Sequence, residues 1–174
     1  LFFGCAIPDG ENERILHLLR RSTQNIVLIG MPGSGKTTIG AALAQLCGRT
    51  LIDLDEQIVL TAGKPIPEIF AESGEAAFRA LEREQAQTWG KESGLVLVTG
   101  GGIVKDERNY QSLRQNGRIY QITRELALLP REGRPLSLTT DMETMLRERA
   151  PLYARFRNAS IANDSTPEAA AAEI

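Results

Sequence analysis

Residues 30–37 read Gly-Met-Pro-Gly-Ser-Gly-Lys-Thr, between an apolar run at 26–29 and a stretch with helical spacing at 37–47. The octapeptide matches the pattern G-x-x-x-x-G-K-[ST] at every fixed position, and the predicted strand before it and helix after it are the context that this pattern requires. Such glycines let backbone N–H groups turn inward around phosphate oxygens, while the helix N-terminus adds its dipole. The alternative, a chance match in a glycine-rich turn, does not account for both flanks. The stretch therefore predicts a P-loop.

This loop assigns roles to individual residues. Lys36 is expected to reach the β- and γ-phosphates of ATP, and the Thr37 hydroxyl is expected to ligate Mg²⁺ as the cofactor. The predicted ATP-binding residues here are Gly33, Ser34, Gly35, Lys36, Thr37 and Thr38.

Outward from the loop, apolar strands alternate with helical stretches as far as the C-terminus. The predicted strands are 26–29, 51–55, 95–99, 118–123 and 159–161. This alternation predicts an α/β fold of three layers, with a five-stranded parallel sheet between helices and ligands bound at the carboxyl ends of the strands. Residues 25–174 are expected to form this domain. Residues 1–24, with a helix at 13–21, are interpreted as an N-terminal appendage, the end of a preceding domain or a linker.

Composition limits the partners. The chain has 174 residues, of which 42% are hydrophobic and 24% charged, so one domain can bury a core. A net charge of −2 does not favour binding to nucleic acid or an anionic membrane. No apolar run approaches the ~20 residues of a membrane span. Cys5 and Cys47 lack metal-ligand spacing and are interpreted as free thiols in a reducing compartment, so a cytoplasmic location is predicted. The chain is expected to be a monomer or a domain of a fusion.

Two acids, Asp53 and Asp55, stand at the carboxyl end of the second predicted strand. At the end of a strand both carboxylates can reach the ligand cleft, where one could hold a Mg²⁺-bound water and the other an acceptor hydroxyl. The alternative is that they are solvated or cap the next helix.

Three glycines, Gly100, Gly101 and Gly102, follow the third predicted strand. Without side chains they allow a ligand to approach the backbone closely; a flexible turn is the alternative. Arg79 lies on a predicted helix at 75–89, where an arginine is usually solvated.

Two further arginines, Arg134 and Arg149, are candidate site residues because of their positions in the chain. Residues 124–140 have weak periodicity and are interpreted as a mobile lid, and its Arg134 could meet the transferring phosphoryl group while closure excludes water. Arg149 precedes Pro151, which ends or kinks the helix at 141–155 and so fixes where the arginine points.

Together, GMPGSGKTT, DLDEQI, IPEIFAESGEAAFRALE, TGGG, GRPL and ERAPLY resemble the shikimate kinase family, within the nucleoside-monophosphate-kinase-like P-loop fold. The resemblance runs from about residue 25 to the C-terminus. It implies transfer of the γ-phosphoryl of MgATP to the 3-hydroxyl of shikimate, giving ADP and shikimate 3-phosphate in aromatic amino-acid biosynthesis. It assigns shikimate binding to Asp55, Arg79, Gly101 and Arg149, with Gly100 and Gly102 beside them. Lys36, Asp55 and Arg134 become the catalytic residues, and Thr37 and Asp53 (through water) hold the metal.

The sequence departs from the family in a shorter stretch between Tyr120 and Arg134, in Ser137 after R-P-L, and in Asn158. In some bacteria the kinase is fused behind shikimate dehydrogenase, which would fit the missing initial Met. The rivals are a gluconate or nucleotide kinase and a nucleotide-binding switch, but the chain has no N-K-x-D motif for reading a guanine base.

Overall fold

Strands and helices alternate along the chain. The computed structural model describes residues 10–125 and 142–174. The strands are β1 (Asn25–Ile29), β2 (Thr50–Asp53), β3 (Leu95–Val98), β4 (Gly117–Thr123) and β5 (Ala159–Ala162). The helices are α1 (Glu11–Thr23), α2 (Lys36–Cys47), α3 (Leu54–Ala62), α4 (Ile66–Gly90), the 3-10 helix η1 (Ile103–Lys105), α5 (Glu107–Arg114), α6 (Met142–Phe156) and α7 (Pro167–Ala172).

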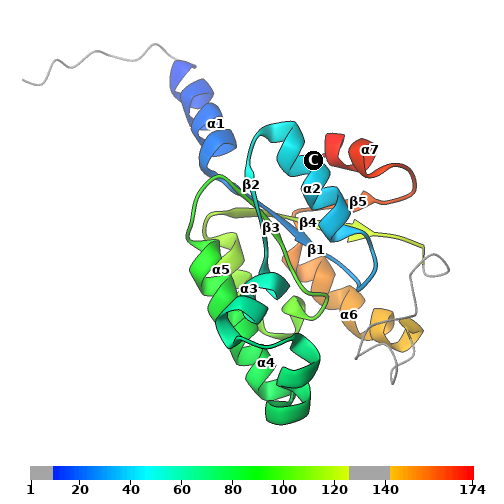
Figure 1. The fold of residues 1–174 in the computed structure, drawn as a ribbon. Helices are drawn as coiled ribbons and strands as arrows, with labels where there is room; N and C mark the ends of the chain where they lie inside the picture. The colour runs from blue at the N-terminus through cyan, green and yellow to red at the C-terminus, as the bar shows by residue number, and fades with distance from the viewer. Residues whose placement is uncertain (1–9, 126–141) are drawn as a thin grey trace, which may run out of the picture.

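Strand β1 lies in the middle of a five-stranded parallel sheet with the order β2-β3-β1-β4-β5. Val27 of β1 pairs with Leu97 of β3 on one side and with Ile119 of β4 on the other. The loop after β1 therefore leaves the sheet at the centre of its carboxyl edge, where open parallel sheets bind their ligands (Figure 1).

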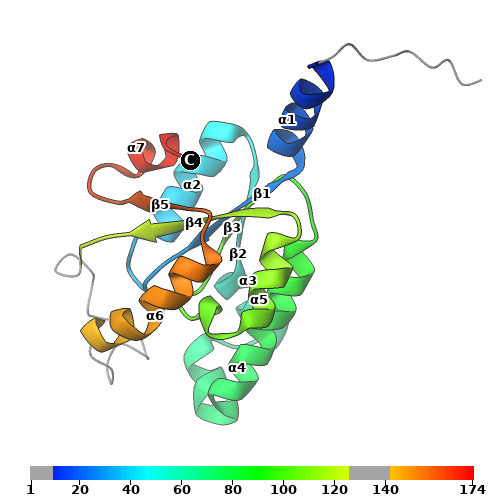
Figure 2. The same cartoon turned by 180° about the vertical axis from the view of Figure 1, so that it is seen from behind.

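The side chains of β1 alternate between two cores, one on each face of the sheet. Val27 and Ile29 face a core shared with α3, α4, α5 and α6. Leu28 faces the opposite core, which α2 and α7 cover. The two opposite views show these helices in separate layers (Figures 1 and 2). The predicted three-layer fold with five parallel strands is thus confirmed.

The differences from the predicted elements that matter most for the site concern the second strand and α4. The second strand was predicted over 51–55, which is wrong at its carboxyl end: β2 stops at Asp53, whose carboxylate accepts a hydrogen bond from the Asp55 N–H and so caps α3. The helices predicted at 66–71 and 75–89 join into α4, which bends at Gly74. The φ of 77° at Gly74 lies in the left-handed region, which glycine enters without a steric cost.

Helix α1 stands at the amino ends of the strands, far from the carboxyl edge, and extends away from the rest of the fold in both views (Figures 1 and 2). Its Ile15, Leu16, Leu18 and Leu19 are exposed. Of the predicted lid at 124–140, residues 126–140 lie outside the described part of the chain, and Arg134 is among them. No helix among residues 10–125 and 142–174 is long and apolar enough to cross a membrane.

Candidate active site

A cavity of about 600 Å³ opens at the carboxyl edge of the sheet. The predicted site residues that line it are Gly33, Gly35, Lys36, Thr37, Thr38, Asp53, Asp55, Arg79, Gly100, Gly101, Gly102 and Arg149. Ser34 is fully buried in the same loop and does not line the cavity. The structure therefore brings together the predicted P-loop and acceptor residues, apart from Arg134, which lies outside the described part of the chain.

The P-loop is preformed around its lysine. Gly33 and Gly35 have φ values of 82° and 93°, which side-chain-bearing residues rarely adopt. The buried Lys36 ammonium group donates hydrogen bonds to the carbonyl oxygens of Gly30 at 3.0 Å and Met31 at 2.9 Å. The positive charge is thereby held inside the loop, where the phosphates of a nucleotide would lie.

A hydroxyl and a carboxylate meet beside this loop. The Thr37 hydroxyl donates to Asp53 Oδ2 at 3.2 Å, while Asp53 Oδ1 accepts from the Asp55 N–H at 3.0 Å. Asp53 therefore caps α3 and also lines the cavity. A place in the ligand cleft and a role as helix cap, which were given as alternatives, are compatible for this residue. Within residues 10–125 and 142–174 no group of three or more His, Cys, Asp or Glu side chains could hold a metal ion. Mg²⁺ suits such a site, because it takes one or two protein oxygens and completes its shell with phosphate and water.

Asp55 lies in the first turn of α3 rather than on a strand. It faces Gly100 closely: a Cβ built on Gly100 would lie 2.8 Å from Asp55 Oδ1 and 3.3 Å from Glu82 Oε1. The two carboxylates thus approach the same glycine, and only a residue without a side chain leaves both of them room.

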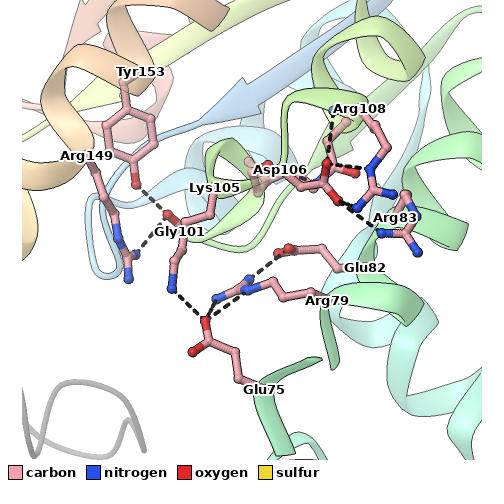
Figure 3. A network of polar contacts seen from close by, with 12 residues as sticks. Glu75, Arg79, Glu82, Arg83, Gly101, Lys105, Asp106, Arg108, Arg149 and Tyr153 are labelled. Atoms are coloured by element: carbon pink, nitrogen blue, oxygen red, sulfur yellow. Dashed lines mark hydrogen bonds and ion pairs between the residues drawn. The ribbon is translucent and has the colours of Figure 1, made fainter. Parts of the chain in front are cut away.

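Arg79 is held by two carboxylates of its own helix rather than solvated. Its side chain is 13% exposed. The Nη1 group donates to Glu82 Oε2 at 2.7 Å, and Nε and Nη2 donate to Glu75 Oε1 at 3.2 and 3.1 Å (Figure 3). Glu75 and Arg79 are four residues apart, and Arg79 and Glu82 three, so these side chains share one face of α4.

Glu82 is the least exposed acid of this group, with only 1% of its side chain accessible. Its second oxygen, Oε1, accepts no hydrogen bond from the described residues. Burial raises the pKa of Glu82 to about 7, although Arg79 opposes the shift.

Gly102 makes room for Arg79. A Cβ on Gly102 would overlap Arg79 Nη1 and lie 2.5 Å from Nη2, so the guanidinium sits directly against the glycine backbone. A Cβ on Gly101 would lie 2.7 Å from the Pro32 ring of the P-loop. Each glycine of the triplet therefore packs against a different wall of the cavity, which a merely flexible turn does not explain.

Arg149 reaches the same triplet from α6. Its Nη1 donates to the Gly101 carbonyl at 3.0 Å, and the Tyr153 hydroxyl donates to the same oxygen at 2.6 Å (Figure 3). Burial raises the pKa of Tyr153 to about 12, so its hydroxyl stays protonated. Helix α6 runs through Pro151 and continues to Phe156. The prediction that the proline ends the helix is therefore wrong; a kink was the other predicted outcome.

Sequence reasoning missed three residues that shape the site. Glu82 could have been found from its spacing to Arg79, since residues three apart on a helix face the same way. Tyr153 belongs to the E-R-A-P-L-Y motif, but its hydrogen bond to Gly101 has no sequence signal. Asn163, after β5, donates through Nδ2 to the Ser34 carbonyl of the P-loop at 2.8 Å, a contact that only the fold creates.

Known proteins share these features. The family model "Shikimate kinase" matches residues 32–174. A shikimate kinase of Salinispora arenicola is 42% identical over 156 residues, covering 85% of this chain and 93% of that relative. A shikimate kinase of Chlorobaculum tepidum is 47% identical over 94 residues, covering 54% of this chain but 49% of the relative. In a third, from Coxiella burnetii, 41% identity extends over 60% of this chain and 59% of the relative. The chain thus spans about half the length of the first curated relatives it matches.

Solved structures agree with the fold. The shikimate kinase of Acinetobacter baumannii in complex with shikimate has a TM-score of 0.82 at 31% identity, covering 90% of this chain and 93% of that one. The Aquifex aeolicus shikimate kinase has a TM-score of 0.75 at 29% identity, covering 86% and 92%. Because the family model matches most of the chain, including the P-loop from Pro32 onward and the acceptor side of the cavity, this chain belongs to the shikimate kinase family.

Proposed function

We propose that this chain transfers the γ-phosphoryl group of MgATP to the 3-hydroxyl of shikimate, giving ADP and shikimate 3-phosphate. The observation that carries the proposal is the single cavity lined both by the P-loop residues Lys36 and Thr37 and by Asp55, Arg79 and Arg149. Family membership and the likeness to a relative solved with shikimate support it.

The nucleotide side of the cavity fits MgATP. In this proposal the P-loop N–H groups and Lys36 bind the phosphates, while Thr37 and Asp53 provide the protein oxygens for Mg²⁺, Asp53 through a water molecule. When bound, the ion neutralises part of the charge on the phosphates. Thr38 lies beside them on the cavity wall.

The acceptor side fits a hydroxylated carboxylic acid. Arg79 and Arg149 provide two guanidinium groups, which pair well with a carboxylate because they can donate two parallel hydrogen bonds. Asp55 and Glu82 provide oxygens for hydroxyl groups, and the glycine triplet allows the ring to approach the backbone. This combination distinguishes the cavity from one built to receive a nucleobase.

The transfer forms a bond between the acceptor 3-oxygen and the γ-phosphorus and breaks the bond between that phosphorus and the β–γ bridging oxygen, which leaves with ADP. Asp55 accepts a hydrogen bond from the 3-hydroxyl and receives its proton as the new bond forms. Because the transition state of phosphoryl transfer is loose, orientation of the hydroxyl by Asp55 contributes more than its strength as a base.

We propose further that residues 25–174 form the kinase domain and that it acts in the cytoplasm, where ATP is supplied. The family match begins at Pro32 and runs to the C-terminus, which supports this boundary.

A coupled assay of ADP release tests the activity, with shikimate, gluconate or a nucleoside monophosphate as acceptor. Only shikimate should raise ADP release well above the background without acceptor. Arg79→Ala and Arg149→Ala should each raise the KM for shikimate by roughly 10- to 100-fold and change the KM for ATP little, since a charge-assisted pair is lost. Equal release with and without shikimate would overturn the proposal, and equal effects on both KM values would move the arginines to the nucleotide side.

A further inference from the structure

Glu75 occupies one edge of Arg79 and is itself shared with a lysine. Its Oε1 accepts hydrogen bonds from Arg79 Nε and Nη2 and, at 2.6 Å, from the ammonium group of Lys105 (Figure 3). Lys105 ends η1, the helix that follows directly on the glycine triplet, and this triplet contacts the guanidinium. One carboxylate oxygen is thus divided between two cations, of which Arg79 lines the cavity.

The two carboxylates that hold Arg79 differ in their accessibility. The side chain of Glu82 is 1% exposed, whereas those of Glu75 and Lys105 are 46% and 42% exposed. A partly exposed ion pair is weak and easily exchanged, because water screens it and solvates the separated groups. Breaking a buried one leaves an uncompensated charge and costs far more. Glu82 is therefore the lasting partner of Arg79, and Glu75 the replaceable one.

The edge that Glu75 occupies is one that can bind a carboxylate. A guanidinium offers two such edges, Nε with Nη2 and Nη1 with Nη2, and the second already engages Glu82 through Nη1. An incoming carboxylate must displace Glu75 to use the first edge, or share it at the expense of repulsion between like charges.

We propose that Glu75 holds the place of the acceptor carboxylate on Arg79 in the free protein, and that Lys105 retains Glu75 when the acceptor takes over this edge. Lys105 and Glu75 are then positioning residues that set the affinity for carboxylate acceptors through Arg79. Lys105 stabilises Glu75 once Glu75 has left Arg79, so Lys105 favours binding of the acceptor. Glu75 competes with the acceptor carboxylate for Arg79. This inference rests on the proposed function, because it takes the acceptor to be shikimate.

Steady-state kinetics with saturating MgATP test the exchange in Lys105→Met, Glu75→Gln and the double variant. Lys105→Met should raise the KM for shikimate roughly two- to fivefold, the range of partly exposed ion pairs, and change kcat less. Glu75→Gln should lower that KM by a similar factor, and the double variant should behave like Glu75→Gln. Lys91→Met, which removes an exposed lysine at the far end of α4, is the matched control and should leave both constants unchanged.

The double variant separates the exchange from a long-range effect of charge. If Lys105→Met raises KM by the same factor in the wild-type background and in the Glu75→Gln background, Lys105 acts only as a nearby positive charge, and the proposal is overturned. A higher KM in Glu75→Gln would overturn it too, because Glu75 would then orient Arg79 for the ligand.

A measurement without any acceptor keeps this inference distinct from the proposed activity. Hydrogen exchange of the Arg79 Nε proton, followed by ¹⁵N NMR, should slow in Lys105→Met, where Glu75 binds Arg79 alone, and quicken in Glu75→Gln. If the exchange rate of the Arg79 Nε proton is the same in both variants as in the wild type, Glu75 is not shared between Arg79 and Lys105, and the proposal is refuted. Absence of shikimate-dependent ADP release in the wild type, with the expected exchange rates, would refute the proposed activity alone.

Discussion

The carbonyl oxygen of Gly101 accepts a 2.6 Å hydrogen bond from the hydroxyl of Tyr153, and Arg149 donates to the same oxygen. Tyr153→Phe removes one donor and keeps the packing of the ring. We expect the unfolding free energy to fall by about 1 kcal/mol, the net value of one hydrogen bond. The KM for shikimate should rise roughly three- to tenfold, because the glycine triplet and Arg149 lose a common anchor. Thermal unfolding and steady-state kinetics check both; an unchanged KM would limit Tyr153 to a structural role.

Gly102→Ala tests the packing of Arg79 against the triplet. The added methyl group would clash with the guanidinium, so Arg79 must move and its buried ion pair with Glu82 is disrupted. The midpoint of thermal unfolding should therefore fall by roughly 5 °C or more. The KM for shikimate should rise about tenfold or more, because Arg79 leaves its position. Gly100→Ala, which would reach Asp55 instead, should lower kcat more than it raises KM. The same kinetic pattern in both variants would argue against separate roles.

Asp55→Asn and Asp53→Asn should differ in their kinetics. Asparagine keeps the shape of each side chain and removes its charge. At position 55 we expect kcat to fall by about 100-fold or more with a smaller change in shikimate affinity, because the attacking hydroxyl loses the charged oxygen that orients it and receives its proton. At position 53, higher Mg²⁺ should restore part of the activity. Titration of Mg²⁺ in both variants checks this, and rescue of the position 55 variant would reverse the assignment.

Shikimate binding should depend on pH through Glu82. Its pKa is raised to about 7, so this carboxyl becomes protonated as the pH falls through neutrality, and the charge near Arg79 and Arg149 becomes more positive. The KM for shikimate should therefore be lower at pH 6 than at pH 8. The same raised pKa makes the ionised form of Glu82 unfavourable in the fold, so its contribution to stability is greatest below its unfolded pKa and declines as the pH rises toward 7.

A pH series of KM for the wild type and Glu82→Gln checks this assignment. The dependence near neutrality should disappear in the variant, because glutamine does not titrate. A wild-type KM that does not vary between pH 6 and pH 8 would show that Glu82 keeps one protonation state throughout.

Lys36→Ala should reduce kcat with shikimate by at least about 1000-fold, because the γ-phosphate loses its principal cation. Thr37→Val preserves the volume of the side chain and removes the hydroxyl, so it should weaken the Mg²⁺-dependent activity while the fold remains stable. Circular dichroism and a Mg²⁺ titration of ADP release check the pair. Near-normal turnover in Lys36→Ala would contradict the role assigned to the P-loop.

The first three strands of this fold could be predicted because each is an apolar run that ends at glycine or acid, as at Ile29 and Gly30. The second strand was misplaced at its end because an aspartate can finish a strand or cap a helix, and sequence alone does not separate these outcomes. Asp53 does both, since it is the last residue of β2 and caps α3, which brings Asp55 into a helical turn.

The acceptor residues could be predicted because the family resemblance assigns them roles, whereas their partners stand in the same motifs without an assigned role. Glu75 and Glu82 look like ordinary surface acids on an amphipathic helix, since composition does not show which face is covered. Their roles depend on how α4 packs against η1 and the glycine triplet. Contacts between distant segments, such as that of Arg149 with Gly101, depend on tertiary packing, which local patterns do not encode.

The hydrogen bond from Asn163 to the carbonyl of Ser34 joins residues that are 129 positions apart. On a translating ribosome the nucleotide loop is therefore made 129 residues before the asparagine that bonds to it. Since long-range contacts form only once both segments are available, the loop lacks this bond while those residues are being added. Competence to bind nucleotide should therefore arrive only after Asn163 has been made, when the central strands have paired.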